Sequence, residues 1–227
     1  VGTYVDNGQV STAVVYTALM TAVGLSEKSK GTKYQAVGKV PLTSEAQRPS
    51  WKICDGATVT SLVPATGFLD CSNPNNCSVI LRLDFGKTSY VFTGDAEQEE
   101  EKDLLADSAV KAKLDVSVLK VGHHGSDTSS TWNFLDAVKP LCALVSSGKK
   151  DEGMNAGYKH PRASAIKKLN KILHQVVPNM PWRNKTVAAY GSVKGVWVDQ
   201  KMRDGVSLTP LDGDIVSKSD GKQVTCR

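Results

Sequence analysis

Short apolar runs rich in β-branched residues alternate along this chain with segments of helical character, and this alternation constrains the fold more than any other feature. The sequence predicts strands at Ser78–Leu83, Ser89–Thr93, Leu114–Val121 and Leu141–Ser146, and helices at Asp95–Ala106, Ser130–Val138 and Pro161–Leu173. The first two strands are joined by a glycine-containing link, which predicts a hairpin. The last two strands are mostly apolar, which is typical of strands buried on both faces. Strands alternating with helices predict a layered α/β fold.

The 227 residues suit a single domain, for which three parts are expected. Residues 1–56 contain one helix, Ser11–Val23, followed by a polar linker. That helix has apolar residues on most faces, so it is expected to pack in a core. Residues 57–175 form the motif-bearing core, beginning with a β-rich run at Ala57–Val63, and residues 176–227 form a β-rich tail.

The net charge of +5 permits an anionic substrate, including nucleic acid, without requiring one. The basic residues are dispersed, and the small clusters Lys149-Lys150 and Lys167-Lys168 are interpreted as solvated surface. No apolar run reaches the roughly 18 residues of a membrane span, so neither an anchor nor a signal peptide is expected in this chain. The start at Val1, without Met, suggests a fragment or a processed chain.

The five cysteines form no CxxC pair, which argues against a cysteine-based zinc site. Cys71 and Cys77 flank a turn-rich loop that would let them approach and form a disulfide. Cys142 lies in an apolar run and is predicted to be a buried free thiol. The candidate disulfide and two glycosylation sequons, at Asn76 and Asn184, favour a secreted or extracytoplasmic protein.

The first candidate site residue is Asp95, which follows an apolar strand in Thr93-Gly94-Asp95. A carboxylate at a strand end offers two oxygens on a rigid support and can bridge two metal ions. The alternative is that Asp95 caps the helix that follows, an ordinary role for aspartate. The nearby run Glu99-Glu100-Glu101 is interpreted as a solvated face.

The second candidate is the pair His123-His124, which directly follows a buried strand and is bracketed by Gly122 and Gly125. Imidazole is the commonest metal ligand, and it also exchanges protons near neutral pH. Adjacent side chains point in different directions, so one ring can bind metal while the other faces substrate. Glycine on both sides lets the backbone turn sharply and leaves room for a ligand. The alternative is a pair of surface histidines in a turn.

The third candidate is His160, which precedes the Pro161 that opens a predicted helix. The free N–H groups of a helix start attract anions such as phosphate. The alternative is a helix-entry residue without a chemical role. His174, towards the end of the same helix, is interpreted as structural. The sequence has no nucleophile elbow, Walker loop or dinucleotide-binding glycine motif.

Taken in order, NNCSVILRLDFGKTSYVFTGD, LDVSVLKVGHHGSDTSSTWNFL and YKHP resemble the metallo-β-lactamase superfamily, and in particular its ComEC-like branch. The branch is also similar to bacterial phosphorylcholine esterases. The resemblance covers roughly Val59 to Leu173. It implies an αββα sandwich with a dinuclear metal site, usually zinc and sometimes manganese. It further implies that a metal-activated water attacks an ester, often a phosphodiester.

Position by position, the resemblance implies that Asp95 is the bridging aspartate and His124 a metal ligand. His123 matches a second-shell residue or proton shuttle, and His160 matches the late histidine near the substrate or the metal. Asn76 falls where many relatives have a histidine. Asn76, Ser126 and Lys159 are assigned to substrate contact or to the second shell.

The chain departs from the family at its front, because the family's ligand-rich signature HxHxDH is absent and no histidine precedes His123. The leading hypothesis is a metal-dependent hydrolase of phosphodiesters, of nucleic acid or a small molecule. The second hypothesis is a non-catalytic protein of the same fold that binds a ligand or nucleic acid. A third is that an N-terminal partner peptide completes the fold and the metal site.

Overall fold

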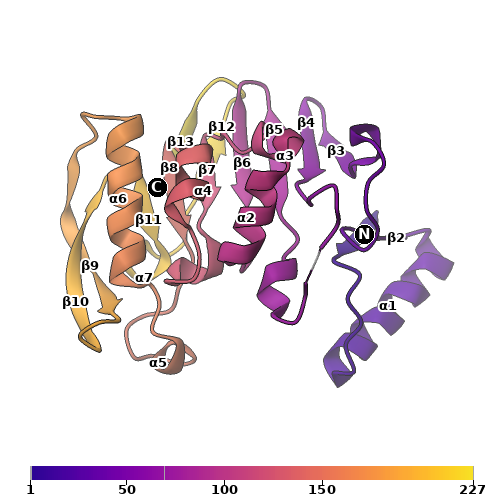
Figure 1. The fold of residues 1–227 in the computed structure, drawn as a ribbon, viewed down its shortest axis with the longest axis horizontal. Helices are drawn as coiled ribbons and strands as arrows, with labels where there is room; N and C mark the ends of the chain where they lie inside the picture. The colour runs from indigo at the N-terminus through magenta and orange to yellow at the C-terminus, as the bar shows by residue number, and fades with distance from the viewer. Residues whose placement is uncertain (1, 69, 227) are drawn as a thin grey trace.

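The computed structural model describes residues 2–68 and 70–226, and its centre is a mixed sheet of seven strands. In spatial order the strands are β11 (Val206–Leu208), β8 (Cys142–Val145), β7 (Val118–Lys120), β6 (Thr88–Phe92), β5 (Leu81–Phe85), β4 (Ala57–Ser61) and β3 (Ser50–Cys54). The four strands from β11 to β6 are parallel, and β6 to β3 form an antiparallel meander. The sheet runs through the middle of the molecule in Figure 1.

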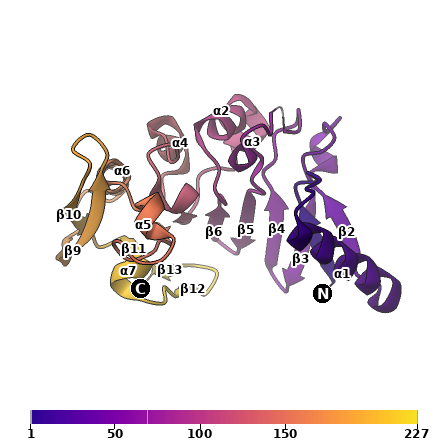
Figure 2. The same ribbon diagram turned by 90° about the horizontal axis from the view of Figure 1, so that it is seen from below.

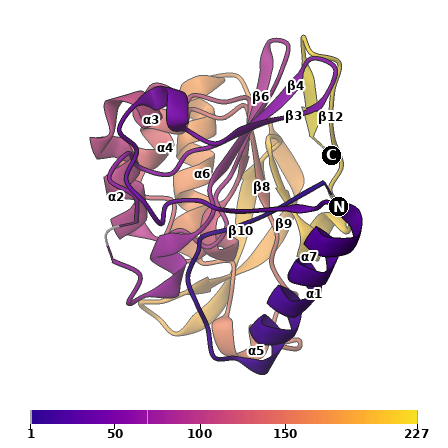
Figure 3. The ribbon, with the colours of Figure 1, turned by 90° about the vertical axis from the view of Figure 1, so that its right-hand side faces the viewer.

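Helices cover one face of this sheet, as Figures 2 and 3 show. They are α2 (Gln98–Ala106), α3 (Ser108–Lys111), α4 (Trp132–Val138) and α6 (Ala163–Val176). Successive strand side chains point to opposite faces, so Val91, Leu119 and Ala143 enter the main core beneath the helices. Leu135 and Ile166 meet them from the helix side.

The second face of the sheet is covered only in part, by the hairpin of β12 (Ser217–Ser219) and β13 (Val224–Cys226). This hairpin lies on the side of the sheet away from the helices (Figures 2 and 3). Cys142 of β8 forms a disulfide with Cys226 of β13. The prediction that Cys142 is a free thiol was therefore wrong, because a partner 84 residues away is brought to it only by the tertiary fold. The predicted Cys71–Cys77 disulfide is present.

The remaining elements lie at the two ends of the sheet. At one end, β9 (Trp182–Gly191) and β10 (Val196–Arg203) form a hairpin beside α6 (Figure 1). At the other end are β1 (Thr3–Asp6), α1 (Val14–Lys30) and β2 (Lys33–Ala36). Short segments complete the chain: α5 (Asn155–Tyr158), α7 (Thr209–Asp212) and the 3₁₀ turns η1 (Glu45–Gln47), η2 (Pro74–Cys77) and η3 (Gly122–Gly125). No helix of the described residues is both long and apolar enough to cross a membrane.

Most predicted core elements are confirmed, with shifted ends. The hairpin is β5–β6, and its turn is Gly86-Lys87. The predicted helix from Asp95 begins only at Gln98, because the backbone of Glu97 is extended. The strand expected from Leu114 is confined to Val118–Lys120.

The prediction for residues 1–56 was less accurate. The region contains three strands, β1, β2 and β3, besides the expected helix. The helix is displaced to Val14–Lys30, and Val23 is its one buried residue among those described. It stands apart from the helical layer in Figure 1. The expectation that it packs in a core was wrong, because Val14 and Val15 are each more than 80% exposed.

Candidate functional site

The predicted site residues gather at the carboxyl ends of β6, β7 and β8, where α/β sheets place their ligands. A cavity of about 600 Å³ opens there. Its lining includes Asp95 after β6, His123 and His124 after β7, and His160 after α5. A larger hollow of about 810 Å³ lies at the opposite ends of the same strands, and none of these residues lines it.

The turn that carries His123 and His124 has an unusual backbone. Both residues have left-handed conformations, with φ of 41° and 54°. Non-glycine residues adopt this region rarely, and such strain concentrates at functional sites. The flanking glycines are required by geometry: a Cβ at Gly122 would overlap the Ser129 hydroxyl, and Gly125 has a φ of +78°. The prediction that glycine leaves room for a sharp turn is confirmed.

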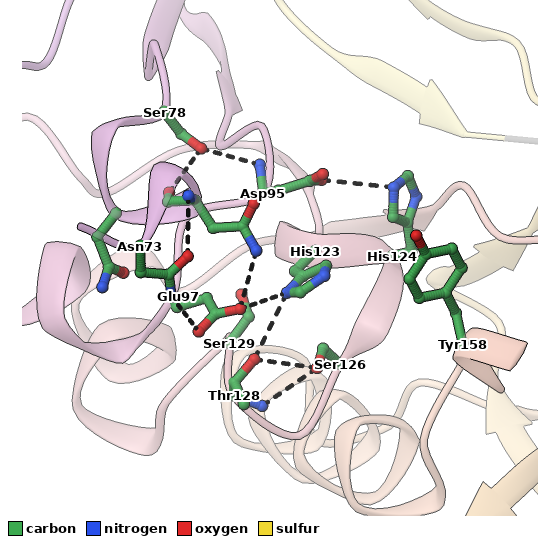
Figure 4. A network of polar contacts seen from close by, with 12 residues as sticks. Asn73, Ser78, Asp95, Glu97, His123, His124, Ser126, Thr128, Ser129 and Tyr158 are labelled. Carbon is green, nitrogen blue, oxygen red and sulfur yellow. Dashed lines mark hydrogen bonds and ion pairs between the residues drawn. The ribbon is translucent and has the colours of Figure 1, made fainter. Parts of the chain in front are cut away.

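His124 and Asp95 both line the cavity, and their side chains point toward each other (Figure 4). The Nδ1 of His124 lies 2.7 Å from the backbone carbonyl oxygen of Ser146. Since a carbonyl only accepts, Nδ1 donates to it, and Nε2 is the ring nitrogen that faces Asp95. That Nε2 lies 3.4 Å from Oδ1 of Asp95. A ring nitrogen and a carboxylate oxygen that face each other at this distance share either a proton or a cation. A backbone carbonyl on the opposite ring nitrogen is a usual partner of a metal-binding histidine.

Asp95 is held in place from its backbone and from a neighbouring lysine. Its N–H donates to Oγ of Ser78 at 3.1 Å. The Nζ of Lys120 lies 4.0 Å from Oδ1 of Asp95 and donates to the carbonyl of Gly94. The residue that precedes α2 as its N-cap is Glu97, so Asp95 is not the cap of that helix. The carboxylate therefore faces His124 and Lys120 instead of capping the helix.

Glu97 is a site residue that the sequence interpretation missed. Its Oε1 lies 2.8 Å from Nδ1 of His123. Two amides from the loop before β5 also donate to this carboxylate, Asn73 at 3.1 Å and Asn75 at 3.0 Å (Figure 4). A carboxylate that accepts from Nδ1 fixes the orientation of the His123 ring, so that Nε2 is the nitrogen available to the cavity. In the sequence, Glu97 looked like one of several acidic residues near a helix start, and only the fold separates it from them.

His160 is buried and fixed through its main chain. Its N–H donates to Oδ1 of Asn155, and its carbonyl accepts from Nδ2 of the same side chain. Burial, reinforced by the neighbouring His123, lowers the pKa of His160 to about 4, so the ring is neutral at physiological pH. Its ring centroid is 5.3 Å from that of His123, and its buried Nδ1 has no hydrogen-bond partner among residues 2–68 and 70–226.

The other three residues assigned to substrate or second shell lie outside the cavity lining. Asn76 donates to Glu99 at 3.3 Å. Ser126 shares a hydrogen bond with Thr128. The Nζ of Lys159 lies 3.3 Å from Asp151.

The expectation that Glu99, Glu100 and Glu101 form a solvated face was wrong, because Glu100 and Glu101 are each only 2% exposed. Glu101 accepts from the backbone N–H groups of Ser130 and Thr131, at 2.6 and 2.8 Å, and so ties α2 to the start of α4. Burial raises its pKa.

Glu100 accepts from the N–H of Ser78 at 3.2 Å. Burial raises the pKa of Glu100 to about 9, so it is protonated at neutral pH. Through Ser78, which also receives the N–H of Asp95, this buried acid supports the loop on which Asp95 sits.

The side chains at the cavity can be compared with what a metal site requires. The side chains of Asp95 and His124 converge, but nowhere in residues 2–68 and 70–226 do three or more His, Cys, Asp or Glu side chains come together as a metal site would require. A catalytic zinc site typically has three protein ligands. A carboxylate and an imidazole are donors of the kind that divalent metals bind, and a complete coordination shell would need further ligands.

No family model matches this chain. It is 34% identical over 102 residues to ComE operon protein 3 of Bacillus subtilis (strain 168) and 36% identical over 97 residues to Recombination protein 2 of Haemophilus influenzae. It is also 33% identical over 143 residues to Competence protein ComA of Neisseria gonorrhoeae. These alignments cover 45%, 43% and 56% of this chain. The chain spans only 12%, 11% and 19% of the relatives' own lengths, so over about half of its residues it is similar to one segment of much longer proteins named for competence and recombination.

Proposed function

We propose that this chain carries part of the metal site of a hydrolase that cleaves phosphodiesters, within a protein that acts in DNA uptake. The observation that carries the proposal is the pairing of Asp95 with His124, whose Nδ1 is fixed on a carbonyl and whose Nε2 faces the carboxylate at 3.4 Å. The names of the relatives support the link to DNA uptake, and the net charge of +5 suits an anionic substrate.

Asp95 and His124 would hold the metal, zinc or manganese. A bound divalent cation would supply Lewis-acid activation of water and of a phosphoryl oxygen. His123, oriented by Glu97, would take and return a proton at its Nε2. His160, neutral and fixed by Asn155, would line the substrate side without adding charge.

We further propose that the sheet is one of the two sheets of an αββα sandwich. An apolar hollow of about 490 Å³ on the face away from the helices supports the presence of a second sheet there. Its lining includes Ile53 and Phe92, which are 58% and 42% exposed. A second layer, such as a partner peptide, would cover these side chains and bring further metal ligands. The two disulfides support an oxidising, extracytoplasmic location.

The test uses the metal-saturated full-length protein with bis(p-nitrophenyl) phosphate and linear DNA as substrates. We expect metal-dependent hydrolysis, and a loss of about a hundredfold or more in kcat on replacing a ligand by Asp95→Asn or His124→Ala. Glu99→Gln is the matched control, because Glu99 is a nearby exposed carboxylate that contacts Asn76 and Gln98 instead. Absence of hydrolysis of both substrates with zinc and with manganese would defeat the proposal.

The incomplete ligand set favours a second candidate, a non-catalytic protein that binds a ligand or nucleic acid with the same fold. Elemental analysis separates the two candidates. A full-length protein that retains no transition metal after reconstitution would favour the binding protein.

A further inference from the structure

A further hollow, of about 340 Å³, lies outside the candidate metal site, between α6 and the β9–β10 hairpin. We call it the α6 groove. Its lining residues are Lys167, Asn170, Lys171, His174, Trp182, Gln200, Lys201 and Arg203. All eight are described by the structure, and none is a carboxylate. Figure 1 shows α6 and the hairpin side by side at one end of the molecule.

The cations of the α6 groove lie close together without a carboxylate among the lining residues, and Lys171 also lies over a ring outside the groove, with its Nζ 4.5 Å from the centroid of Trp132. Lys167 and Lys171 are exposed and four residues apart on α6, so they share a helix face. Like charges at this spacing are mildly destabilising. Lys201 and Arg203 bring further positive charge from β10. The negative charges of a bound polyanion would offset the repulsion between these neighbouring cations.

An aromatic side chain lies among these cations. Trp182 is 50% exposed, and the guanidinium of Arg203 lies 4.3 Å from the centroid of its ring. The Nε of Arg203 is buried and has no hydrogen-bond partner in the described part of the chain. Positive groups beside an exposed aromatic ring are what single-strand binders combine, because phosphates contact the cations and an unpaired base stacks on the ring.

The two walls of the groove are joined rigidly by Asn170. Its Nδ2 donates to the carbonyl of Lys201 at 2.8 Å, and its Oδ1 accepts from the N–H of Arg203 at 2.8 Å. The groove therefore exists before any ligand arrives, which lowers the entropic cost of binding.

We propose that the α6 groove binds single-stranded nucleic acid, with phosphates on Lys167, Lys171 and Lys201 and a base stacked on Trp182. A duplex is a poorer fit, since its bases are already stacked on each other. The helix that forms one wall of the groove starts close in sequence to the candidate metal site: α6 begins three residues after His160, and Lys167 lies about 6 Å along the helix axis from that start. The proposal does not depend on hydrolysis, because none of the groove residues lines the cavity of the metal site.

The test is fluorescence anisotropy with a labelled oligothymidylate of about 12 nucleotides, in EDTA, so that the metal site plays no part. The triple variant Lys167→Glu, Lys171→Glu, Lys201→Glu should bind at least about tenfold more weakly, with a salt slope smaller by about 2. The matched control reverses three exposed lysines at the far end, Lys28→Glu, Lys30→Glu and Lys33→Glu, for the same change in net charge. It should bind like the wild type.

The role of Trp182 is tested separately. Trp182→Ala should weaken binding roughly tenfold, the loss of one stacked base, and Trp182→Phe should restore most of it. Heparin and duplex DNA serve as competitors and should displace the single strand poorly. Equal weakening by both lysine triples, no effect of Trp182→Ala, or equal competition by heparin would each overturn the proposal. Because binding is measured in EDTA and without hydrolysis, failure of the hydrolytic proposal would leave this result standing, and failure of binding would leave the hydrolytic proposal standing.

Discussion

At the scale of single residues, the site depends on pairs in which one group fixes the other. The Ser146 carbonyl sets the proton of His124, and Glu97 sets the orientation of His123. Glu97 is in turn held by Asn73 and Asn75. The loop that carries these asparagines is closed by the Cys71–Cys77 disulfide. Asn73 and Asn75, which the sequence analysis did not assign to the site, therefore support the ring of His123 through Glu97.

Glu97→Gln tests this dependence. The change keeps the size of the side chain but removes the charge that faces Nδ1 of His123, so the protonated ring is less well stabilised during turnover. We expect kcat of the full-length protein to fall by about 10–100-fold with little change in KM. A free energy of unfolding in urea so low that the unfolded fraction accounts for the whole fall in kcat would contradict a positioning role.

At the scale of secondary-structure elements, α2 has two unequal faces. Glu99 lies at the surface, whereas Glu100 and Glu101 turn inwards. The single helix thereby connects the loop of Asp95, through Ser78, and the start of α4, through Ser130 and Thr131. An acidic run of three residues has no apolar periodicity, so its burial could not be read from the sequence.

Glu100 predicts a pH dependence of stability. Its folded pKa of about 9 lies above the ordinary value of 4.5, so between these values the folded state holds a proton that the unfolded state has lost. The free energy of unfolding must then fall as pH rises through this window, by at most about 1.4 kcal/mol per pH unit from this group. Glu100→Gln, which cannot ionise, removes that loss.

The measurement compares urea unfolding of the wild type and Glu100→Gln at two pH values. We expect the two proteins to be similar at about pH 5.5 and the variant to gain on the order of 2 kcal/mol over the wild type at about pH 8. A difference that is the same at both pH values would show that Glu100 does not hold its proton in the folded protein. Glu99→Gln, at the surface of the same helix, is the control.

At the scale of the whole molecule, the sheet has one face with a full helical layer and one face with little cover. The β12–β13 hairpin covers part of the second face, around Tyr90, Val118 and Cys142. The disulfide between Cys142 and Cys226 fastens this hairpin to β8 across 84 residues of sequence. A cross-link that closes so long a loop restricts the unfolded chain strongly.

Replacing both cysteines, Cys142→Ser with Cys226→Ser, should therefore lower the free energy of unfolding by about 2–5 kcal/mol. The helix signal in circular dichroism should be retained, since the hairpin contacts the face opposite the helices (Figure 3). Cys54→Ser is the control, because Cys54 is exposed and unpaired. An unchanged midpoint in urea would mean that this disulfide does not form in the protein.

The sequence by itself determined the alternation of strands and helices from β4 to α6 and the residues at the strand ends. These follow from local patterns: β-rich runs, a glycine in a hairpin turn, and glycines on both sides of His123-His124. The strand-end positions made Asp95 and the His123-His124 pair candidate site residues, whereas the choice of Asp95 and His124 as metal ligands came from the family resemblance and stays a prediction. The structure brings these two side chains to 3.4 Å.

Only the tertiary structure decided the rest, because those features depend on contacts between distant segments. Cys142 meets Cys226, Glu97 meets His123, and Glu100 and Glu101 are buried by the loops that pack over α2. The exposure of α1 and the α6 groove likewise depend on which neighbours the fold supplies. Local sequence fixes what an element is, whereas the pairing of partners far apart in the chain requires the packed fold.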